Sequence, residues 1–163
     1  MQEDINENQQ ESPFFRAKFT AIISDMHLTE AEPEHPEGDL WKKFKRKEFF
    51  FDDELTDFFN HIQEQAGQEK VELILNGDIF DFDGVVSVPE DAPYRITWLE
   101  KARGLNPEEP KASYKIRKIL QEHDVFVKSL REFIRNGNRV VMVIGNHDLE
   151  LHYGRVQQDI REM

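Results

Sequence analysis

The stretch Arg139-Val-Val-Met-Val-Ile-Gly-Asn-His-Asp148 decides the fold, and the rest of the sequence is interpreted from it. Its apolar run, Val140 to Ile144, is rich in β-branched residues and is flanked by glycine and asparagine on both sides. This pattern is typical of a strand that is buried on both faces of a parallel sheet. Polar groups that follow such a strand lie where open α/β sheets place their chemistry. We therefore expect Asn146 to be a metal ligand and His147 to meet a phosphate.

Two earlier apolar runs also end in polar residues. The run from Phe19 to Ile23 predicts a first strand, and Asp25-x-His27 follows it. The run from Val71 to Asn76 predicts a second strand, and Gly77-Asp78-x-x-Asp81 follows it. Residues two apart in extended backbone point to the same side, so Asp25 and His27 are expected to aim at one point.

Helical patterns separate these strands. Apolar residues at helical spacing predict an amphipathic helix over residues 48–65 and one continuous helix over residues 111–135, which Gly137 would cap. His123 in the second helix is expected to be a packed or half-exposed histidine rather than a metal ligand. Residues 149–163 also look helical. The alternation of strands and helices implies right-handed crossovers and therefore an α/β fold with a mostly parallel sheet in βαβαβ order.

The remaining segments are less regular. Residues 1–13 are polar and acidic and predict a flexible tail, so the domain is expected to span residues 14–163. Residues 85–110 form an insertion with four prolines and one short helical piece, and such insertions often shape a binding site or dock a partner. Five basic residues within 42–47 predict either a solvated helix start or an electropositive lip for an anionic substrate.

Composition limits the chemistry. The 163 residues carry a net charge of −12 and include no cysteine, so disulfides, thiolate zinc sites and cysteine nucleophiles are excluded. The negative charge argues against general nucleic-acid binding. It leaves room for a small phosphorylated substrate where a metal reverses the local charge, and carboxylate, imidazole and amide ligands suit manganese, iron, magnesium or zinc. The sequence contains no apolar run of transmembrane length and no signal pattern, so we expect a cytoplasmic protein.

The three polar clusters are expected to converge, because the carboxyl ends of parallel strands lie on one edge of a sheet. Two dications about 3.5–4 Å apart can clamp an in-line displacement at phosphorus. Asp78, on the middle segment, is best placed to bridge them, and Asp25 with His27 would complete one side. Asn146 would offer a neutral oxygen to the second ion.

The residues around these ligands have predicted supporting roles. His147 is expected to stabilise charge on the phosphoryl group or to protonate the leaving group. Asp148 is expected to orient His147 and hold its proton. Asp81 is expected either to support the site from behind its ligands or simply to form a turn.

Together, Asp25-x-His27, Gly77-Asp78-x-x-Asp81 and Gly145-Asn146-His147-Asp148 resemble the first three blocks of the calcineurin-like metallophosphoesterases. The resemblance implies a four-layer α/β/β/α sandwich with a dinuclear metal centre that promotes attack of hydroxide on phosphorus. It implies hydrolysis of phosphomonoesters, phosphodiesters or pyrophosphates. It also implies metal roles for Asp25, His27, Asp78 and Asn146, with Asp78 bridging, and a catalytic role for His147.

The family pattern continues with a lone histidine and then Gly-His-x-His, which are absent before Met163. The resemblance therefore covers the N-terminal half of the family pattern, and we expect the chain to be a fragment or to be completed by another chain. Alone, it is expected to hold metals poorly and to self-associate through an exposed sheet edge. The alternative function is a non-catalytic metallophosphoesterase-like scaffold that docks partners through residues 85–110. A metal-free nucleotide-binding domain is disfavoured, because no strand end carries a glycine-rich phosphate loop.

Overall fold

A three-stranded sheet organises the computed structural model, which describes residues 15–30 and 51–163. Its strands are β1 (Phe19–Ile23), β2 (Val71–Asn76) and β3 (Arg139–Val143). All pairs are parallel and the order is β1-β2-β3, so β2 is central. The predicted α/β fold with a parallel sheet is confirmed, and the carboxyl ends of all three strands lie on one edge.

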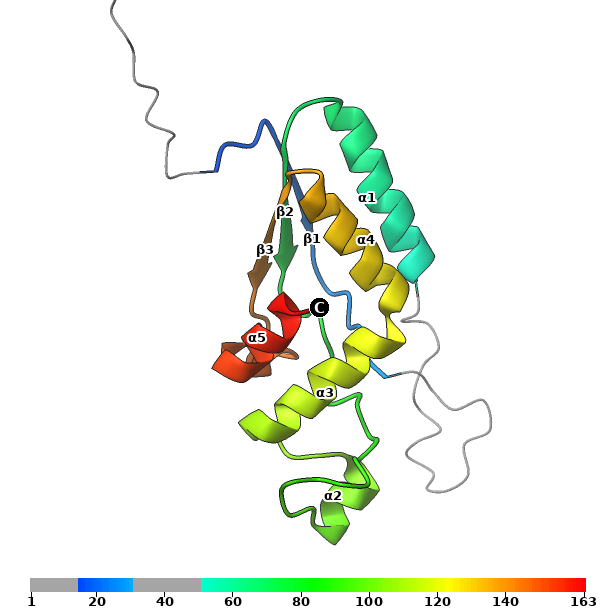
Figure 1. Ribbon diagram of the computed structural model, residues 1–163, viewed down its shortest axis with the longest axis vertical. Helices are drawn as coiled ribbons and strands as arrows, with labels where there is room; N and C mark the ends of the chain where they lie inside the picture. Colours follow the sequence, from blue (N-terminus) through cyan, green and yellow to red (C-terminus); the bar gives the residue numbers. More distant parts are fainter. Residues whose placement is uncertain (1–14, 31–50) are drawn as a thin grey trace, which may run out of the picture.

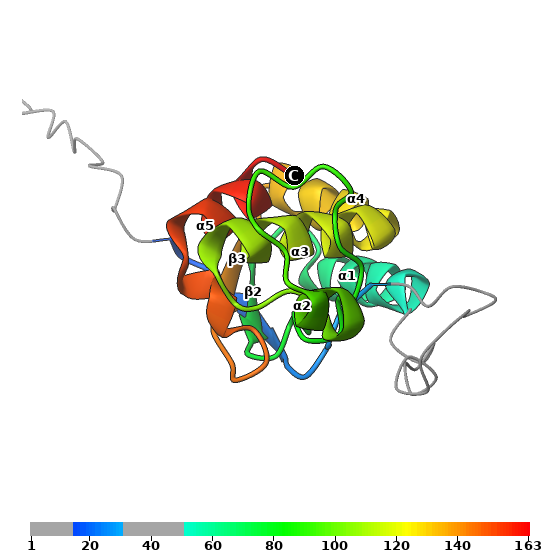
Figure 2. The same ribbon diagram turned by 90° about the horizontal axis from the view of Figure 1, so that it is seen from below.

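The helices cover one face of this sheet. Helices α1 and α4 pack side by side against it, whereas α3 and α5 pack on each other beyond the carboxyl ends of the strands (Figure 1). The view from below shows the same one-sided arrangement (Figure 2). The bounds are α1 Asp52–Ala66, α2 Trp98–Arg103, α3 Glu109–Glu122, α4 Asp124–Arg135, a 3₁₀ turn Leu149–His152 and α5 Gly154–Arg161.

The core lies between the sheet and the helices. Alternate residues of β2, namely Val71, Leu73 and Leu75, are buried, because they face α1 and α4. Phe59 of α1 is central to this layer and its ring lies 5.8 Å from that of Phe133 on α4. Burying such a side chain contributes about 1.5–3 kcal/mol, so this layer fixes the sheet against the helices.

The prediction for the third strand was partly wrong. The strand begins at Arg139 and ends at Val143, so Ile144 lies outside it. It is not buried on both faces, since Val143 is 41% exposed. The reason is its place at the edge of the described sheet, where the helices cover only the face that carries Val140 and Met142.

The helix predicted over residues 111–135 is two helices. The backbone breaks at His123, where φ is −104° and ψ is 47°. The first helix, α3, begins earlier than predicted, at Glu109, and has a proline in its first turn, where the missing N–H costs nothing. Gly137 ends α4 as predicted, with φ of 86° and its N–H donating to the carbonyl of Ile134.

The other boundaries follow local signals. The prediction began this helix at residue 48, but α1 begins at Asp52, so residue 51 was wrongly included in it. Residues 48–50 lie outside the described residues. The insertion over residues 85–110 contains α2, which Thr97 and Glu100 cap reciprocally. The predicted tail 1–13 and the basic cluster 42–47 also lie outside the described residues. Among those that are described, no helix combines the length and apolar character needed to cross a bilayer.

Candidate metal centre

Side chains from all three strand ends converge, as the sequence predicted. Ligand atoms of Asp25, His27 and Asp78 all lie within 4.8 Å of one another. A second group, His27 with Asp81 and His147, meets the same limit. Because His27 belongs to both groups, the two sets of donors are contiguous. Carboxylate and imidazole donors at this spacing fit a divalent ion of the kind that oxygen and nitrogen ligands prefer.

The backbone at this edge adopts an unusual conformation. Asp25, His27 and Asp78 have φ values of 57°, 49° and 51°, in the left-handed region that L-residues rarely occupy. They are the only non-glycine residues with positive φ in the described part of the chain. The N–H of Asp25 donates to the carbonyl of Gly77 at 3.2 Å, and the N–H of His27 donates to the backbone carbonyl of Asp78 at 2.9 Å. These two bonds hold the two loops together. Backbone strain of this kind clusters at functional sites.

Two glycines let these loops approach. A Cβ atom on Gly145 would lie 2.3 Å from Oδ1 of Asp78 and 2.4 Å from its backbone nitrogen. A Cβ atom on Gly77, whose φ is 79°, would lie 3.2 Å from Cα of Gly145. The close approach lets the N–H of His147 donate to Oδ1 of Asp78 at 2.8 Å. The glycines therefore place the third cluster directly against the second.

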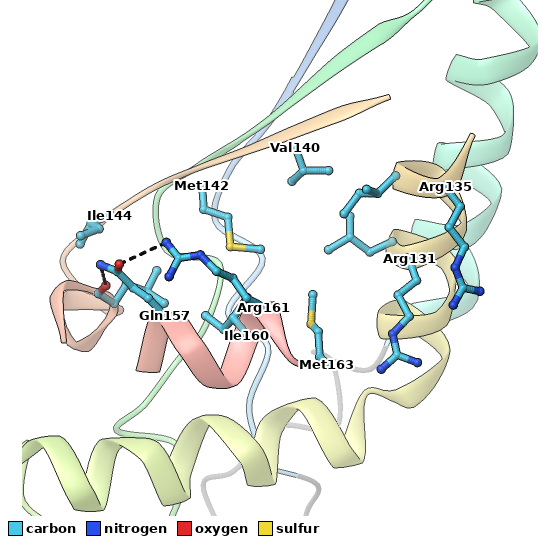
Figure 3. A pocket seen from close by; sticks show the side chains of 12 residues that line it. Arg131, Arg135, Val140, Met142, Ile144, Gln157, Ile160, Arg161 and Met163 are labelled. Carbon is cyan, nitrogen blue, oxygen red and sulfur yellow. Dashed lines mark hydrogen bonds between the residues drawn. The ribbon is translucent and has the colours of Figure 1, made fainter. Parts of the chain in front are cut away.

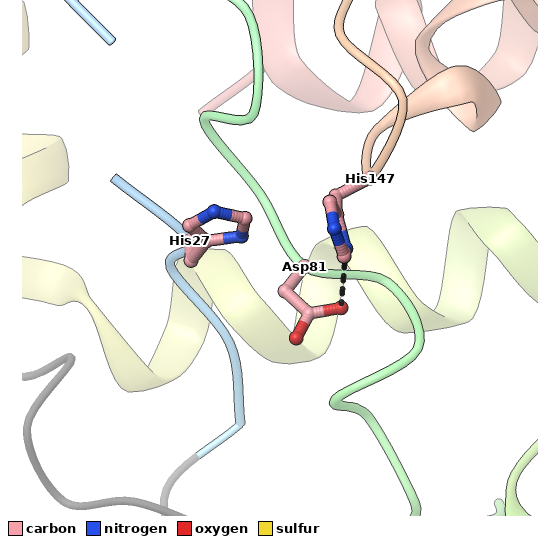
Figure 4. Close-up of side chains that lie close together, drawn as sticks. All are labelled: His27, Asp81 and His147. Carbon is pink, nitrogen blue, oxygen red and sulfur yellow. Dashed lines mark ion pairs between the residues drawn. The ribbon is translucent and has the colours of Figure 1, made fainter. Parts of the chain in front are cut away.

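The two histidines face each other across the site (Figure 4). The ring centroids of His27 and His147 lie 4.7 Å apart, with an interplanar angle of 82°. Nδ1 of His147 lies 4.0 Å from Oδ1 of Asp81, and the His147 side chain is 45% exposed. An accessible imidazole with a carboxylate behind it is suited to proton transfer.

Asp81 forms a turn and also lies close to both histidines. Its Oδ1 accepts a hydrogen bond from the N–H of Gly84 at 3.1 Å, which forms the turn after the cluster. The same oxygen lies 4.0 Å from Nδ1 of His147, and the Asp81 carboxylate belongs to the second donor group. Turn formation by Asp81 is therefore confirmed, whereas its support of the site stays a prediction.

The structure places Asp148 differently from the prediction. Its buried carboxylate accepts hydrogen bonds from the N–H groups of Ile79, at 2.8 Å, and Gly145, at 2.6 Å. Both oxygens thus join the loops after β2 and β3, and the carboxylate facing His147 is that of Asp81. A catalytic role for Asp148 stays a prediction. Asn146 is exposed on the same turn, next to His147.

Sequence inspection missed a buried charge behind the site. Lys115 on α3 is only 2% exposed, and burial lowers its pKa, whereas the nearby carboxylates of Asp83 and Glu150 oppose that shift. Burial raises the pKa of the Glu150 carboxyl group, because in both residues burial disfavours the charged form. Local sequence carries no signal for this pair, because helical periodicity assigns a lysine to the surface by default.

A hollow on the described surface is lined by other residues. It has a volume of about 790 Å³ between β3, α4 and α5 (Figure 3). Its lining combines apolar side chains with three arginines, Arg131, Arg135 and Arg161, and includes no carboxylate or histidine. It therefore lacks the carboxylate and imidazole donors that the strand ends provide, and the candidate metal centre is the strand-end site.

Comparison with known proteins agrees with this geometry. A family model described as calcineurin-like phosphoesterase matches residues 20–162 of the chain. The match begins within β1 and runs past α5, so it includes all three polar clusters. A search of curated proteins and a search of solved structures each found no match.

Proposed function

We propose that this chain, which belongs to the calcineurin-like phosphoesterase family, is a metal-dependent phosphoester hydrolase. The observation that carries the proposal is the pair of contiguous donor groups, which share His27 and lie at the carboxyl ends of three neighbouring strands. Family membership alone indicates the class of reaction. The donor groups support the proposal that this reaction takes place at the strand ends.

The proposed centre holds two divalent ions, with manganese the first choice and iron, magnesium or zinc as alternatives. Asp25, His27 and Asp78 would hold one ion, Asp78 would also reach the second, and the Asn146 carboxamide would add a neutral oxygen there. Bound ions of this kind polarise phosphoryl oxygens and lower the pKa of water. The neutral ligand avoids further negative charge where an anionic substrate must approach.

The chain's own groups position the reactants around that centre. The Asp78 carboxylate accepts a hydrogen bond from the backbone N–H of His147. Its orientation is therefore set by a backbone group and not by another flexible side chain. The exposed His147 imidazole is proposed to donate a proton to the leaving oxygen, with the Asp81 carboxylate facing its Nδ1. Asp148 keeps the two loops in register through backbone bonds, and this is the support that we propose for it.

Hydrolysis by the full chain tests the proposal. We expect weak manganese-stimulated cleavage of an aryl phosphate monoester or a bis-aryl phosphodiester, because the chain carries the first three ligand blocks of the family pattern without its downstream histidines. The rate of hydrolysis should fall at least about a hundredfold in the Asp78→Ala variant, because the proposed bridging carboxylate is removed. Asp57→Ala, an exposed carboxylate on α1, is the matched control and should retain activity.

The result also separates enzyme from scaffold. Retention of metal-stimulated hydrolysis in Asp78→Ala would refute the assignment of the centre. A wild-type chain that neither binds manganese by isothermal titration nor cleaves either ester would instead fit a non-catalytic scaffold. The relative rates on the monoester and the diester would indicate the substrate class.

A further inference from the structure

The break between α3 and α4 is stabilised by distant residues. The apolar helical pattern continues through residues 119–130, yet the helix stops at His123. This histidine is fully buried, and its neighbours Ile119 and Phe126 belong to the core. A polar ring that interrupts a helix in such surroundings requires hydrogen-bond partners there.

Both ring nitrogens have such partners. Nδ1 lies 2.6 Å from Oδ1 of Asp52, and Nε2 lies 2.9 Å from the backbone carbonyl oxygen of Thr29. A carbonyl oxygen can only accept, so Nε2 donates. Asp52 lies in the first turn of α1, and its Oδ2 accepts a hydrogen bond from the N–H of Phe126 at 3.0 Å. His123 therefore joins α1 and the α3–α4 break to the loop after β1.

That loop carries part of the metal centre. Thr29 lies two residues after His27, and its hydroxyl donates to the carbonyl of Asp81 at 2.9 Å. Leu28 lies between His27 and Thr29 and makes two backbone hydrogen bonds to the loop after β2. Its N–H donates to the carbonyl of Ile79, and its carbonyl accepts from the N–H of Asp81, both at 2.9 Å. The two ligand loops are thus joined by a short backbone ladder, and His123 holds the ladder at its Thr29 end.

We propose that His123 is a positioning residue of the metal centre, acting through its Nε2–H bond to the carbonyl of Thr29. This bond fixes the loop whose strained backbone presents Asp25 and His27. The Nδ1 bond to Asp52 has a different task, because it holds the helices together. The inference deepens the proposed function and rests on it for its effect on metal binding.

Two amide substitutions separate the two bonds. The side-chain amide of asparagine occupies the place of Nδ1, so His123→Asn keeps a donor toward Asp52 and loses the bond to Thr29. The longer side chain of glutamine occupies the place of Nε2, so His123→Gln keeps a donor toward Thr29 and loses the bond to Asp52. His61→Asn, an exposed histidine on α1, is the matched control.

Manganese titration of the full chain gives the first readout. We expect His123→Asn to bind manganese about tenfold more weakly than wild type, as do variants that lose outer support of a metal site. His123→Gln and His61→Asn should stay within about threefold of wild type, although His123→Gln should unfold at a lower temperature. Equal weakening in His123→Asn and His123→Gln, or unchanged affinity in His123→Asn, would overturn the proposal.

Hydrogen exchange in the metal-free chain gives a second readout that does not depend on manganese. The amides of His27, Leu28 and Asp81 are hydrogen-bonded within the ladder, and they should exchange faster in His123→Asn than in His123→Gln. Equal exchange in the two variants would overturn the tether. A wild-type chain without manganese binding would overturn the proposed function, and the exchange result would still decide whether His123 holds the loop.

Discussion

Three residues of the candidate centre adopt a backbone conformation that their side chains disfavour. Asp25, His27 and Asp78 all have positive φ. Glycine would relieve the backbone at each position but would remove the carboxylate or imidazole group, and the cost of keeping a side chain there is about 1–3 kcal/mol per residue. The surrounding hydrogen bonds between the two loops offset this cost. The presence of aspartate and histidine at these positions could be read from the sequence. The positive φ values could not, because they depend on hydrogen bonds between two loops that are far apart along the chain.

The contact between Gly145 and Asp78 leads to a prediction about stability. Gly145→Ala is expected to destabilise the fold by about 1–3 kcal/mol, because the new methyl group overlaps the Asp78 carboxylate and backbone nitrogen. Urea unfolding followed by circular dichroism measures the change. Gly154→Ala is the matched control, since a Cβ atom there meets nothing within 4 Å, and it should be neutral or slightly stabilising. Equal stability of wild type and Gly145→Ala would contradict the close approach.

Among the elements, the strands were the most predictable from sequence. Val71–Asn76 was predicted without error, because its β-branched and aliphatic residues, interrupted only by Glu72, end at the polar signal Asn76-Gly77-Asp78. The break at His123 was not predictable, because the partners Asp52 and Thr29 are 71 and 94 residues away along the chain. Local periodicity indicates which face of a helix is apolar. It does not indicate where a distant carboxylate, here Asp52, accepts the hydrogen bonds at a helix break.

The candidate site shows the same division. Convergence of Asp25, His27 and Asp78 was predictable, because parallel strands end on one edge of the sheet. The assignment of Asp148 as the partner of His147 was not supported by its contacts, which are to backbone N–H groups. Adjacent residues in a turn point in different directions, so proximity in sequence did not predict the contact.

Helix α2 gives a prediction about pH. Glu100 caps this helix and lies 2.6 Å from the Lys111 ammonium. The hydrogen bond from Lys111, followed by that from the backbone of Thr97, lowers the pKa of Glu100 from 4.5 to about 2. A carboxyl group whose pKa is lowered on folding contributes stability above its unfolded pKa, and this contribution is lost as the pH falls through its folded pKa. The pair should therefore stabilise the insertion at pH 7 and stop doing so between about pH 4.5 and pH 2.

The variant Glu100→Gln checks this sign. It should be less stable than wild type at pH 7, and the difference in unfolding free energy should shrink steadily as the pH is lowered toward 2. Urea unfolding at a series of pH values measures the difference. Glu109→Gln, an exposed carboxylate at the start of α3, should show a smaller pH-dependent difference. A difference for Glu100→Gln that grows on acidification would show that Lys111 does not lower the pKa of Glu100.

At the scale of the whole molecule, the described helices protect only one face of the sheet. On the opposite face, Ile22 of β1 lies in register with Ile74 of β2, which pairs with Val141 of β3. These three apolar side chains form a continuous row across the sheet, and Ile22 is 64% exposed. Within residues 15–30 and 51–163, no strand pairs with the outer edges of β1 and β3, and apolar surface on such a sheet favours association. The net charge of −12 opposes this tendency by mutual repulsion.

The balance predicts weak self-association that depends on salt. We expect sedimentation velocity to show a larger average mass as protein concentration and ionic strength rise, because salt screens the repulsion but leaves the apolar row unchanged. Ile22→Lys should reduce this association, since a charge in the row of an edge strand opposes pairing. The control is Trp98→Ala, which removes a side chain that is 80% exposed on α2, outside the sheet, and should leave association unchanged. Association that persists in Ile22→Lys but disappears in Trp98→Ala would assign the contact to the insertion instead.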